Sequence, residues 1–587
     1  MTKPYRISML IVLVAITIHA GAAEGTQTQV GSTAVDSVNV HEKAREAQRQ
    51  FEKLRVAQLP WGWERARSRT DEVVGRLLLI DDSDETWVPA SEPESIRRAR
   101  QRLLATLDRA AQQLPGDSWI AGQRVWYAVE GGDARAALDR LAGCRAELWW
   151  CRSLEGFALH AADDFVAAEE AFNAALAAMP RTRRERWLDP TDLFDRDARR
   201  AYQRLDHSKR EAFVRRFWWL ADPFYAVPGN DRLTEHFARH VQDRILENAR
   251  SPFEMPWGKD LREVLVRYGW PVGWERIKRR SGGLGSTSRP GIIGHDPAGE
   301  RCFAPSGAVL ETPTLVAPGE WSIDDEGAPT SYGPRYAQRT DDLDHQLALF
   351  RRAGEVVVVV GWQAADSIAK GSALEVALVA TSGPNEPPRV SRQSTRESRG
   401  ALELQVPWAP AVVSVEALAP EAGRAARARY GLPIAGAVTK RPAVSDLLLL
   451  DSPGELPVSL EAAAPRARGS TRVWSNERLG VYWELYPGPG RPHEVSIAVA
   501  LKDERQGFWR QLGTALNLAG DRSDSVALEW TESIPVGTFV YPRSLEVSLP
   551  ELSPGEYTLE LTVRFDDSSR AVANRAITVE RRDFARR

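Results

Sequence analysis

The hydrophobic and polar positions divide the chain into a helical first half and a strand-rich second half. Up to about residue 249, apolar residues recur three and four positions apart, as they do on the buried face of an amphipathic helix. From Glu355 onward, short aliphatic and β-branched runs are separated by turn residues, as strands are. The pattern predicts a multidomain α-then-β chain, with a mixed α/β module where the two halves meet.

The first 22 residues have the pattern of a secretory signal peptide. Lys3 and Arg6 precede an apolar run of about ten residues, which is too short for a stable membrane span. Small residues follow at positions 20–22, where we expect cleavage. Residues 1–22 therefore predict export to the periplasm or to the outside of the cell, and no later stretch predicts a membrane span.

Residues 23–92 are expected to combine a polar leader with an N-terminal helical region. The leader is predicted to be flexible up to Val40, and helical periodicity begins near His41. The segment 71–89 fits a helix and a short strand equally well, so both alternatives stay open.

Internal repetition marks residues 93–195, with a period of 34 residues. This offset relates Gly122 to Gly156 and Leu138 to Phe172. The second copy resembles a tetratricopeptide repeat in its glycine, alanine, aromatic, alanine and proline positions, which are Gly156, Ala168, Phe172, Ala175 and Pro180. The resemblance implies a stack of antiparallel helix pairs, because a lone repeat cannot bury its own apolar face.

Two roles for this helical stack stay open. It can bind a protein partner on a concave face, or it can support a neighbouring domain of the same chain. Four tryptophans are the candidates for a partner-binding groove: Trp119, Trp126, Trp149 and Trp150. In the second interpretation they pack between helices, since each tryptophan buries a large area.

The segment 217–274 is the most aromatic part of the chain and connects its two halves. Asp222-Pro223 ends one predicted helix, because proline disfavours helical geometry in the residue before it. A second predicted helix runs from Arg232 to Ala249. Alternating apolar residues at 261–269 then predict a strand.

Polar residues at the start of the second helix fit an N-terminal cap. Asn230 or Asp231 can accept hydrogen bonds from the free amides of the first turn, and Glu235 lies near the positive end of the helix dipole. His236 and His240 lie one turn apart and could both face a metal, but we assign them to the solvated side of the helix. No metal and no cofactor is predicted.

The order of these turns resembles that of the GWxTD domain, a family of exported bacterial proteins with no assigned activity. In that family an aspartate-proline turn and an asparagine-led helix precede a Gly-Trp-x-Thr-Asp turn and a segment that ends in Tyr-Gly. The signature turn here reads Pro-Trp-Gly-Lys-Asp, with Lys259 in place of threonine. The matching residues are Asp222, Pro223, Asn230, Glu235, Arg239, Trp257, Gly258, Asp260, Arg262, Arg267, Tyr268, Gly269 and Pro271.

This resemblance implies a GWxTD-like module at residues 196–276. Its polar and aromatic motif residues are the candidates for a binding site: Asp222, Asn230, Glu235, Arg239, Trp257, Asp260, Arg267 and Tyr268. No catalytic residue is predicted among them.

The second half is predicted to begin with an irregular connection rich in glycine and proline, at residues 277–350. A β-rich domain at 351–463 follows. After a linker of alanine, arginine and proline at 464–469, six strand patterns at 470–587 fit an immunoglobulin-like or fibronectin-like sandwich. Whether the two β regions form one domain or two stays open.

Composition adds little to this picture. Lys and Arg number 77 against 80 Asp and Glu, which argues against a general polyanion binder such as a nucleic-acid-binding protein. Three cysteines in an exported chain allow one internal disulfide. Cys144 and Cys151 are either joined across a helix-to-helix corner or, like Cys302, are small buried thiols.

Two function classes remain. The sequence has no phosphate-binding glycine loop, no Gly-x-Ser-x-Gly turn and no His-Glu-x-x-His pair. We therefore predict an exported, non-enzymatic interaction or scaffold protein of the bacterial cell envelope. It would bind protein partners or other envelope components through its helical repeats and β-sandwich domains. The alternative is an envelope hydrolase or ligand-binding protein with a site at the GWxTD-like module.

Overall fold

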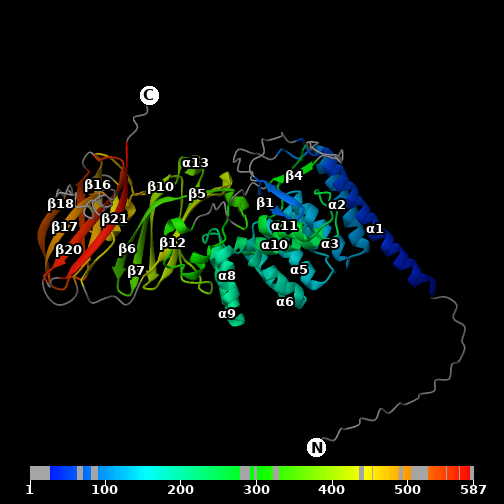
Figure 1. Ribbon diagram of the computed structural model, residues 1–587, viewed down its shortest axis with the longest axis horizontal. Helices are drawn as coiled ribbons and strands as arrows, with labels where there is room; N and C mark the ends of the chain where they lie inside the picture. The colour runs from blue at the N-terminus through cyan, green and yellow to red at the C-terminus, as the bar shows by residue number, and fades with distance from the viewer. Residues whose placement is uncertain are drawn as a thin grey trace, which may run out of the picture.

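The chain has a helical N-terminal half followed by a region of several β-sheets, as the computed structural model in Figure 1 shows. The structure describes residues 27–61, 70–80, 90–277, 291–295, 301–321, 329–369, 371–434, 442–451, 454–487, 493–503, 527–549, 552–566 and 569–581. The expected signal peptide at 1–22 lies outside the described residues. None of the helices in the described ranges has the length and hydrophobicity needed to span a bilayer.

Aspartate side chains begin several helices of the first half. The carboxylates of Asp117, Asp133, Asp164 and Asp195 accept hydrogen bonds from backbone N–H groups in the first turns of α3, α4, α6 and α8. The helices are α1 (Gln27–Gln58), α2 (Glu94–Gln113), α3 (Ser118–Glu130), α4 (Ala134–Leu141), α5 (Leu148–Ala161), α6 (Phe165–Ala178), α7 (Arg181–Trp187), α8 (Arg196–Arg204), α9 (His207–Ala221), α10 (Asp231–Leu246) and α11 (Lys259–Tyr268).

The N-terminal region differs from its prediction. Helix α1 begins at Gln27, so the residues up to Val40 that were expected to form a flexible leader are helical. Of the two alternatives for 71–89, the strand is the one observed: β1 (Thr70–Val74) pairs antiparallel with β2 (Leu77–Ile80). Gly75 in the turn between them has a φ of 55°, which glycine adopts without strain.

The strand predicted at 261–269 is wrong, because these residues form α11. Leu261, Leu265 and Val266 are buried at helical spacing. A short apolar run satisfies both a period of two and a period of 3.6, and alternation over so few residues did not discriminate between them. Gly269, with a φ of 90°, ends the helix.

Helix α10 lies in the core of the helical half. It packs against α3, α5 and α6, and the rings of Phe237 and Phe172 contact each other with centroids 5.4 Å apart. Gly156 allows α5 and α6 to approach closely, because a Cβ there would lie only 2.8 Å from Phe172 Cδ1. The face formed by α3 and α5 is therefore covered by a helix of the same chain.

A second core joins the end of the helical half to the first β region. Buried residues of α9, including Phe217 and Leu220, share it with strand residues such as Val358 and Val415. The region between these elements, predicted to be irregular at 277–350, contains β4 (Gly291–His295), α12 (Gly307–Glu311), β5 (Arg339–Asp342) and most of β6 (Asp344–Arg352). Strand β4 pairs with β3 (Gly273–Ile277).

Among the described residues, four sheets build the β half (Figure 1). The first region contains the sheet β5-β12-β11-β8-β9, with β12 (Arg424–Leu432), β11 (Ala411–Ala419), β8 (Leu374–Thr381) and β9 (Arg389–Thr395), and the sheet β10-β7-β6, with β10 (Arg399–Pro407) and β7 (Glu355–Gln363). In the second region β16 (Arg478–Tyr486) pairs with β13 (Ala443–Val444), β14 (Leu448–Leu450) and β19 (Tyr541–Ser548). Its other sheet is β15-β21-β20-β17-β18, with β15 (Arg472–Trp474), β21 (Arg570–Glu580), β20 (Gly555–Phe565), β17 (His493–Asp503) and β18 (Ala527–Ile534).

The predicted linker at 464–469 is part of a packed core. Ala464 and Ala467 are buried, and a Cβ at Gly361 of β7 would lie 2.0 Å from Arg468 O. Since β13 and β14 pair with β16, the sheet of the last region already begins before the predicted linker. The boundaries 351–463 and 470–587 therefore do not follow the strand pairing.

Candidate functional site

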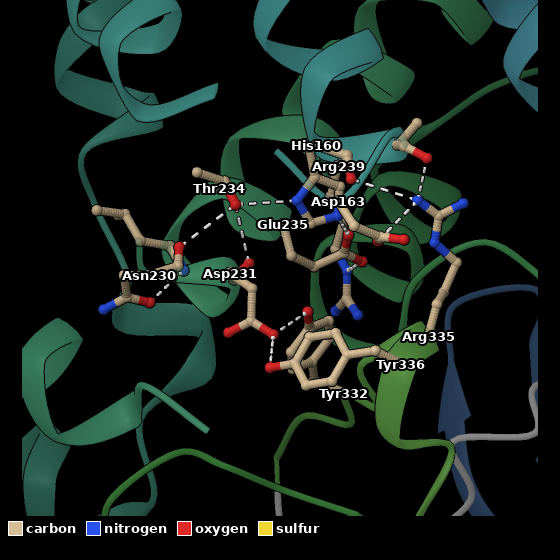
Figure 2. Close-up of polar contacts among 12 residues, drawn as sticks. His160, Asp163, Asn230, Asp231, Thr234, Glu235, Arg239, Tyr332, Arg335 and Tyr336 are labelled. Carbon is tan, nitrogen blue, oxygen red and sulfur yellow. Dashed lines mark hydrogen bonds and ion pairs between the residues drawn. The ribbon is translucent and has the colours of Figure 1, made fainter. Parts of the chain in front are cut away.

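Asn230 caps α10 (Figure 2). Its Oδ1 accepts a hydrogen bond from Leu233 N at 2.9 Å, and its Nδ2 donates to Trp218 O at 2.6 Å. The carboxylate of Glu169 in α6 accepts from the backbone N–H of Asn230. Of the two residues predicted to cap this helix, Asn230 is the cap, and it also ties α10 to α6 and α9.

Asp231 is buried at the start of α10 and bound by two tyrosines. The hydroxyl groups of Tyr332 and Tyr336 donate to Asp231 Oδ2 at 3.0 and 2.8 Å. Burial raises the pKa of Asp231 to about 6, although the two hydroxyl groups favour the charged form. Asp231 thus connects α10 to the segment 329–337.

Glu235 lies between a histidine and an arginine. Its Oε2 is 2.8 Å from His160 Nε2 of α5, and its Oε1 accepts from Arg239 Nε at 2.6 Å. Burial alone raises the pKa of Glu235, but the positive charge of Arg239 and the contact with His160 outweigh it, so the pKa is well below its usual range. Glu235 is therefore held as a carboxylate.

Arg239 joins α10 to two further segments. Its Nη1 donates to Val266 O and Arg267 O at the end of α11, at 3.1 and 2.9 Å, and its Nη2 donates to Ser331 O at 3.0 Å. The carbonyl groups of Val266 and Arg267 lie at a helix end, where they have no N–H partner within the helix, and the charged guanidinium of Arg239 donates to them instead. Arg239 is buried and acts as an internal clamp.

Arg267 and Tyr268 are adjacent and contact each other. The Arg267 guanidinium lies 4.7 Å from the centre of the Tyr268 ring, and its Nη2 donates to Tyr268 Oη at 2.5 Å. The Nε of Arg267 donates to Pro329 O at 2.6 Å, so this pair also fixes the segment 329–337.

The signature turn makes two separate polar contacts. Trp257 Nε1 donates to Asp243 Oδ1 of α10 at 2.8 Å, and Arg262 Nε donates to the other oxygen of Asp243 at the same distance. Asp260 binds the β1–β2 hairpin, since Arg76 Nε donates to Asp260 Oδ2 at 2.6 Å. The hydrogen bonds from Arg76, followed by those from backbone N–H groups, lower the pKa of Asp260 below its usual range. An open depression of about 540 Å³ lies beside this turn.

Asp222 lies at the end of α9, where the chain meets the β half. Burial raises the pKa of its carboxyl well above the usual range, and the charge of Asp231 raises it further. Its backbone oxygen accepts from Arg429 Nη1 of β12 at 2.7 Å. The structure thus places Asp222 against β12, whereas Trp257 and Asp260 line the open depression near the β1–β2 hairpin.

The side chain that binds the turn after Asp222 was not predicted from the sequence. Glu416 of β11 is fully buried and accepts from Tyr225 N at 3.0 Å and Ala226 N at 2.8 Å. Arg429 lies 3.4 Å from Glu416 and 3.7 Å from the centre of the Tyr225 ring. The available signal was a glutamate and an arginine in strands that are otherwise apolar, which predicts a buried pair.

The two histidines of α10 are buried, so their assignment to a solvated face is wrong. His236 and His240 are 1% and 5% exposed, because α10 is surrounded by other elements on nearly all sides. His236 Nε2 lies 2.9 Å from Trp187 O, and His240 stacks on the Trp187 ring. Burial, followed by the charge of Arg232, lowers the pKa of His236 to about 3. In the described ranges no three potential ligands are placed to hold a metal ion.

Thr234, His160 and Glu235 lie in series, as a hydroxyl, an imidazole and a carboxylate do in nucleophilic hydrolases (Figure 2). His160 Nδ1 is 2.9 Å from Thr234 Oγ1. Thr234 is however 0% exposed, and its hydroxyl also lies 3.1 Å from Asp231 O. A substrate cannot reach this oxygen in the conformation described.

The four candidate groove tryptophans make contacts within the chain, and two of the three cysteines form a disulfide. Trp126, Trp149 and Trp150 are buried in the helical core, and Trp119 Nε1 donates to Asn248 O at 3.1 Å. These contacts agree with the packing interpretation of the tryptophans. A disulfide joins Cys144 to Cys151, and Cys302 is buried.

The sequence matches no protein-family profile and no curated protein. Solved structures share only parts of the shape: a superoxide reductase (neelaredoxin) from Ignicoccus hospitalis has 15% identity and a TM-score of 0.13 over 19% of this chain and 75% of that chain. The sporulation control protein Spo0M from Bacillus subtilis has 10% identity and a TM-score of 0.15 over 24% of this chain and 49% of that chain.

Proposed function

We propose that the chain is an exported, non-enzymatic interaction or scaffold protein of the bacterial cell envelope, with a GWxTD-like module as its central joint. One observation carries the proposal. The motif side chains on α10 and at the end of α11 bind other parts of the same chain, and the hydroxyl of Thr234 is buried. A site that served catalysis would need at least one such group open to a substrate.

The helical half is proposed to be tetratricopeptide-like. The residues related by the 34-residue offset, Gly122 and Gly156, lie on α3 and α5, the first helices of two successive pairs. The extensive contacts of α5 with α6 and of α3 with α4 support this assignment. In this proposal α10 takes the position of a bound peptide, so outside partners would contact other surfaces.

The last region is proposed to be an immunoglobulin-like or fibronectin-like sandwich. Strand β20 alternates buried and partly exposed residues, and buried residues of β16, β17 and β20 share one core. Sandwich domains of this kind commonly serve as binding or spacing modules. Protein partners in the envelope are therefore the proposed ligands of the chain.

The test is to isolate the chain with its partner from the source cells. Crosslinking in intact cells, followed by purification of the crosslinked partner, should give a defined complex that forms again from the two purified proteins. N-terminal sequencing of the exported chain should give a start just after residue 22. The proposal fails if the chain stays in the cytoplasm, or if no partner binds the purified chain.

The alternative, an envelope hydrolase, has one observation in its favour, which is the series Thr234, His160 and Glu235. Thr234→Val removes the hydroxyl and keeps the shape of the side chain. We expect purified wild-type and variant chains to show the same absence of turnover on ester, peptide and glycoside substrates. Turnover by the wild type that the variant loses would establish the alternative.

A further inference from the structure

A row of arginines follows the outer face of α8. Arg196, Arg199, Arg200 and Arg204 have the spacing of one helical face, and all four side chains are exposed. The elements α8 and α9, which extend away from the body in Figure 1, carry eight Lys and Arg but three Asp and Glu over residues 196–216. This positive surface belongs to a chain whose net charge is −3.

The opposite face of α8 is fixed by packing. Ala198 is buried, and Tyr202 contacts Phe194 and Phe213 with ring centroids 5.5 and 5.7 Å apart. A Cβ at Gly307 of α12 would lie 2.9 Å from Ala198 N, so α12 packs closely against this face. The helix cannot turn the arginines inward without losing these contacts.

The arginines have few internal partners. Arg200 Nη1 lies 3.3 Å from Asp197 Oδ1, and Arg199 Nη2 donates to Thr191 O at 2.9 Å. Within the described residues, no carboxylate lies in ion-pair distance of Arg196 or Arg204. Like charges four residues apart destabilise a helix, so the four arginines lower the stability of α8. An anion bound from outside the chain would offset this repulsion.

We propose that this arginine face of α8 docks an acidic segment of a partner protein, in which Asp or Glu carboxylates follow the helix. The inference rests on the proposed function as an interaction protein and assigns it a surface. A guanidinium group binds a carboxylate in a two-point geometry. With a rise of about 1.5 Å per residue, Arg196 and Arg204 are about 12 Å apart along the axis, which matches two turns of an acidic helix.

The shape of the surface favours a protein over an anionic membrane. The arginines form a single row, whereas a bilayer presents a plane of phosphates. Helices that lie on membranes also insert large apolar side chains. None of the exposed large hydrophobic side chains found in the described part of the chain lies on α8 or α9.

The test uses the full exported chain and a fluorescent peptide with glutamates four residues apart, compared with the same peptide carrying glutamines. Replacing Arg196, Arg199, Arg200 and Arg204 by Gln should weaken binding of the glutamate peptide by about tenfold or more, because four charged contacts are lost. The matched control replaces four exposed arginines of α2 by Gln, namely Arg97, Arg98, Arg102 and Arg109, and has the same net charge. It should change the affinity by less than about twofold.

Four results would overturn the inference. Equal weakening by the α8 and α2 replacements would show nonspecific attraction. Equal affinity for the glutamate and glutamine peptides would show that carboxylates do not take part in the interaction. Binding of the wild type to phosphatidylglycerol vesicles but not to the peptide, lost in the α8 variant, would assign the surface to membranes. If a partner found in cells still binds the α8 variant, only this inference fails and the proposed function stands.

Discussion

Burial and neighbouring charges shift the pKa values of the buried ionisable residues around α10. Glu235 remains a carboxylate between His160 and Arg239, whereas Asp231 retains a proton at mildly acidic pH. His236 stays neutral because burial opposes its charged form. Asp231 and His236 therefore respond in opposite directions to the same change of pH.

Asp231 should make the protein less stable as the pH rises from 4 to 6. Its folded pKa of about 6 lies above the ordinary carboxyl value of about 4, so the native state binds the proton more tightly than the unfolded state. The stabilisation is present at pH 4 and is lost as the pH rises through 6, by up to about 1.4 kcal/mol per pH unit. Urea unfolding of Asp231→Asn between pH 4 and 7 should lack this loss. An unchanged pH profile would contradict the assignment.

His236 should make the protein less stable as the pH falls. Its folded pKa of about 3 lies below the ordinary value of about 6.5, so the unfolded state takes up a proton that the native state refuses. Its stabilisation is complete above about pH 6.5 and is lost as the pH falls toward 3. His236→Gln retains a donor for Trp187 O and should flatten this loss in the same urea titration. A loss as steep as that of the wild type would refute the prediction.

Asn230→Ala should lower the free energy of unfolding by about 0.5–2 kcal/mol, since loss of an N-cap typically has this cost. The lost hydrogen bond to Trp218 O places the expected value in the upper part of that range. Thermal unfolding measures it, with Asn230→Asp as the control that retains an acceptor for Leu233 N. A melting temperature equal to that of the wild type would exclude the cap.

Local chemistry predicted the cap, but it could not predict the partners of the buried charges. Asn230 stands three residues before the N–H group that it satisfies. His160 and Glu235 are 75 positions apart, and Tyr225 and Glu416 are 191 positions apart. Such pairs depend on how distant elements pack, which no pattern within one helix or strand reveals.

At the scale of elements, close packing between helices determines how the helical half is arranged. Gly156 lets α5 approach α6, and Phe172 fills the space up to Phe237 of α10. The 34-residue repetition predicted the first contact but not the second, because α10 lies outside the repeats. The error at α11 has a related cause: the burial of Leu265 in a core shared with α10 is set by packing and not by the local sequence.

Gly156→Ala should destabilise the chain by about 1–3 kcal/mol, the usual cost of an overfilled core, because the new Cβ would lie 2.8 Å from Phe172 Cδ1. The matched control is Gly143→Ala, where no atom lies within 4 Å of the new Cβ. Its effect should stay within about 0.5 kcal/mol. Equal melting temperatures for the two variants would show that α5 and α6 are not closely packed.

At the scale of the whole molecule, packed cores cross the boundaries that the sequence suggested. Leu447 and Leu449 belong to the core of the last β region, although they precede the predicted linker. The alanine, arginine and proline at 464–469 predicted a linker between domains, but alanines also allow close packing, as at Ala464 and Ala467. The order of helices and strands was predictable from periodicity, whereas the pairing of β13 and β14 with β16 was not.

A fragment that begins at residue 442 should therefore fold more stably than one that begins at residue 472. The shorter fragment lacks β13, β14 and the core residues Leu447 and Leu449, and each buried leucine contributes about 2–5 kcal/mol. Circular dichroism during urea unfolding should show a cooperative transition for 442–587 and a weaker or absent one for 472–587. Equal stability of the two fragments would support a domain boundary at 464–469.

The central claim is that residues 217–226 join the two halves of the molecule. Hydrogen exchange in Glu416→Gln tests it most directly, because this change removes the carboxylate that binds Tyr225 N, Ala226 N and Arg429. The control is Glu484→Gln, a buried carboxylate that binds Arg352 between the two β regions. We expect faster exchange at residues 217–226 and in β11 and β12 for Glu416→Gln only. Faster exchange confined to β11 and β12, with residues 217–226 protected as in the wild type, would contradict the claim.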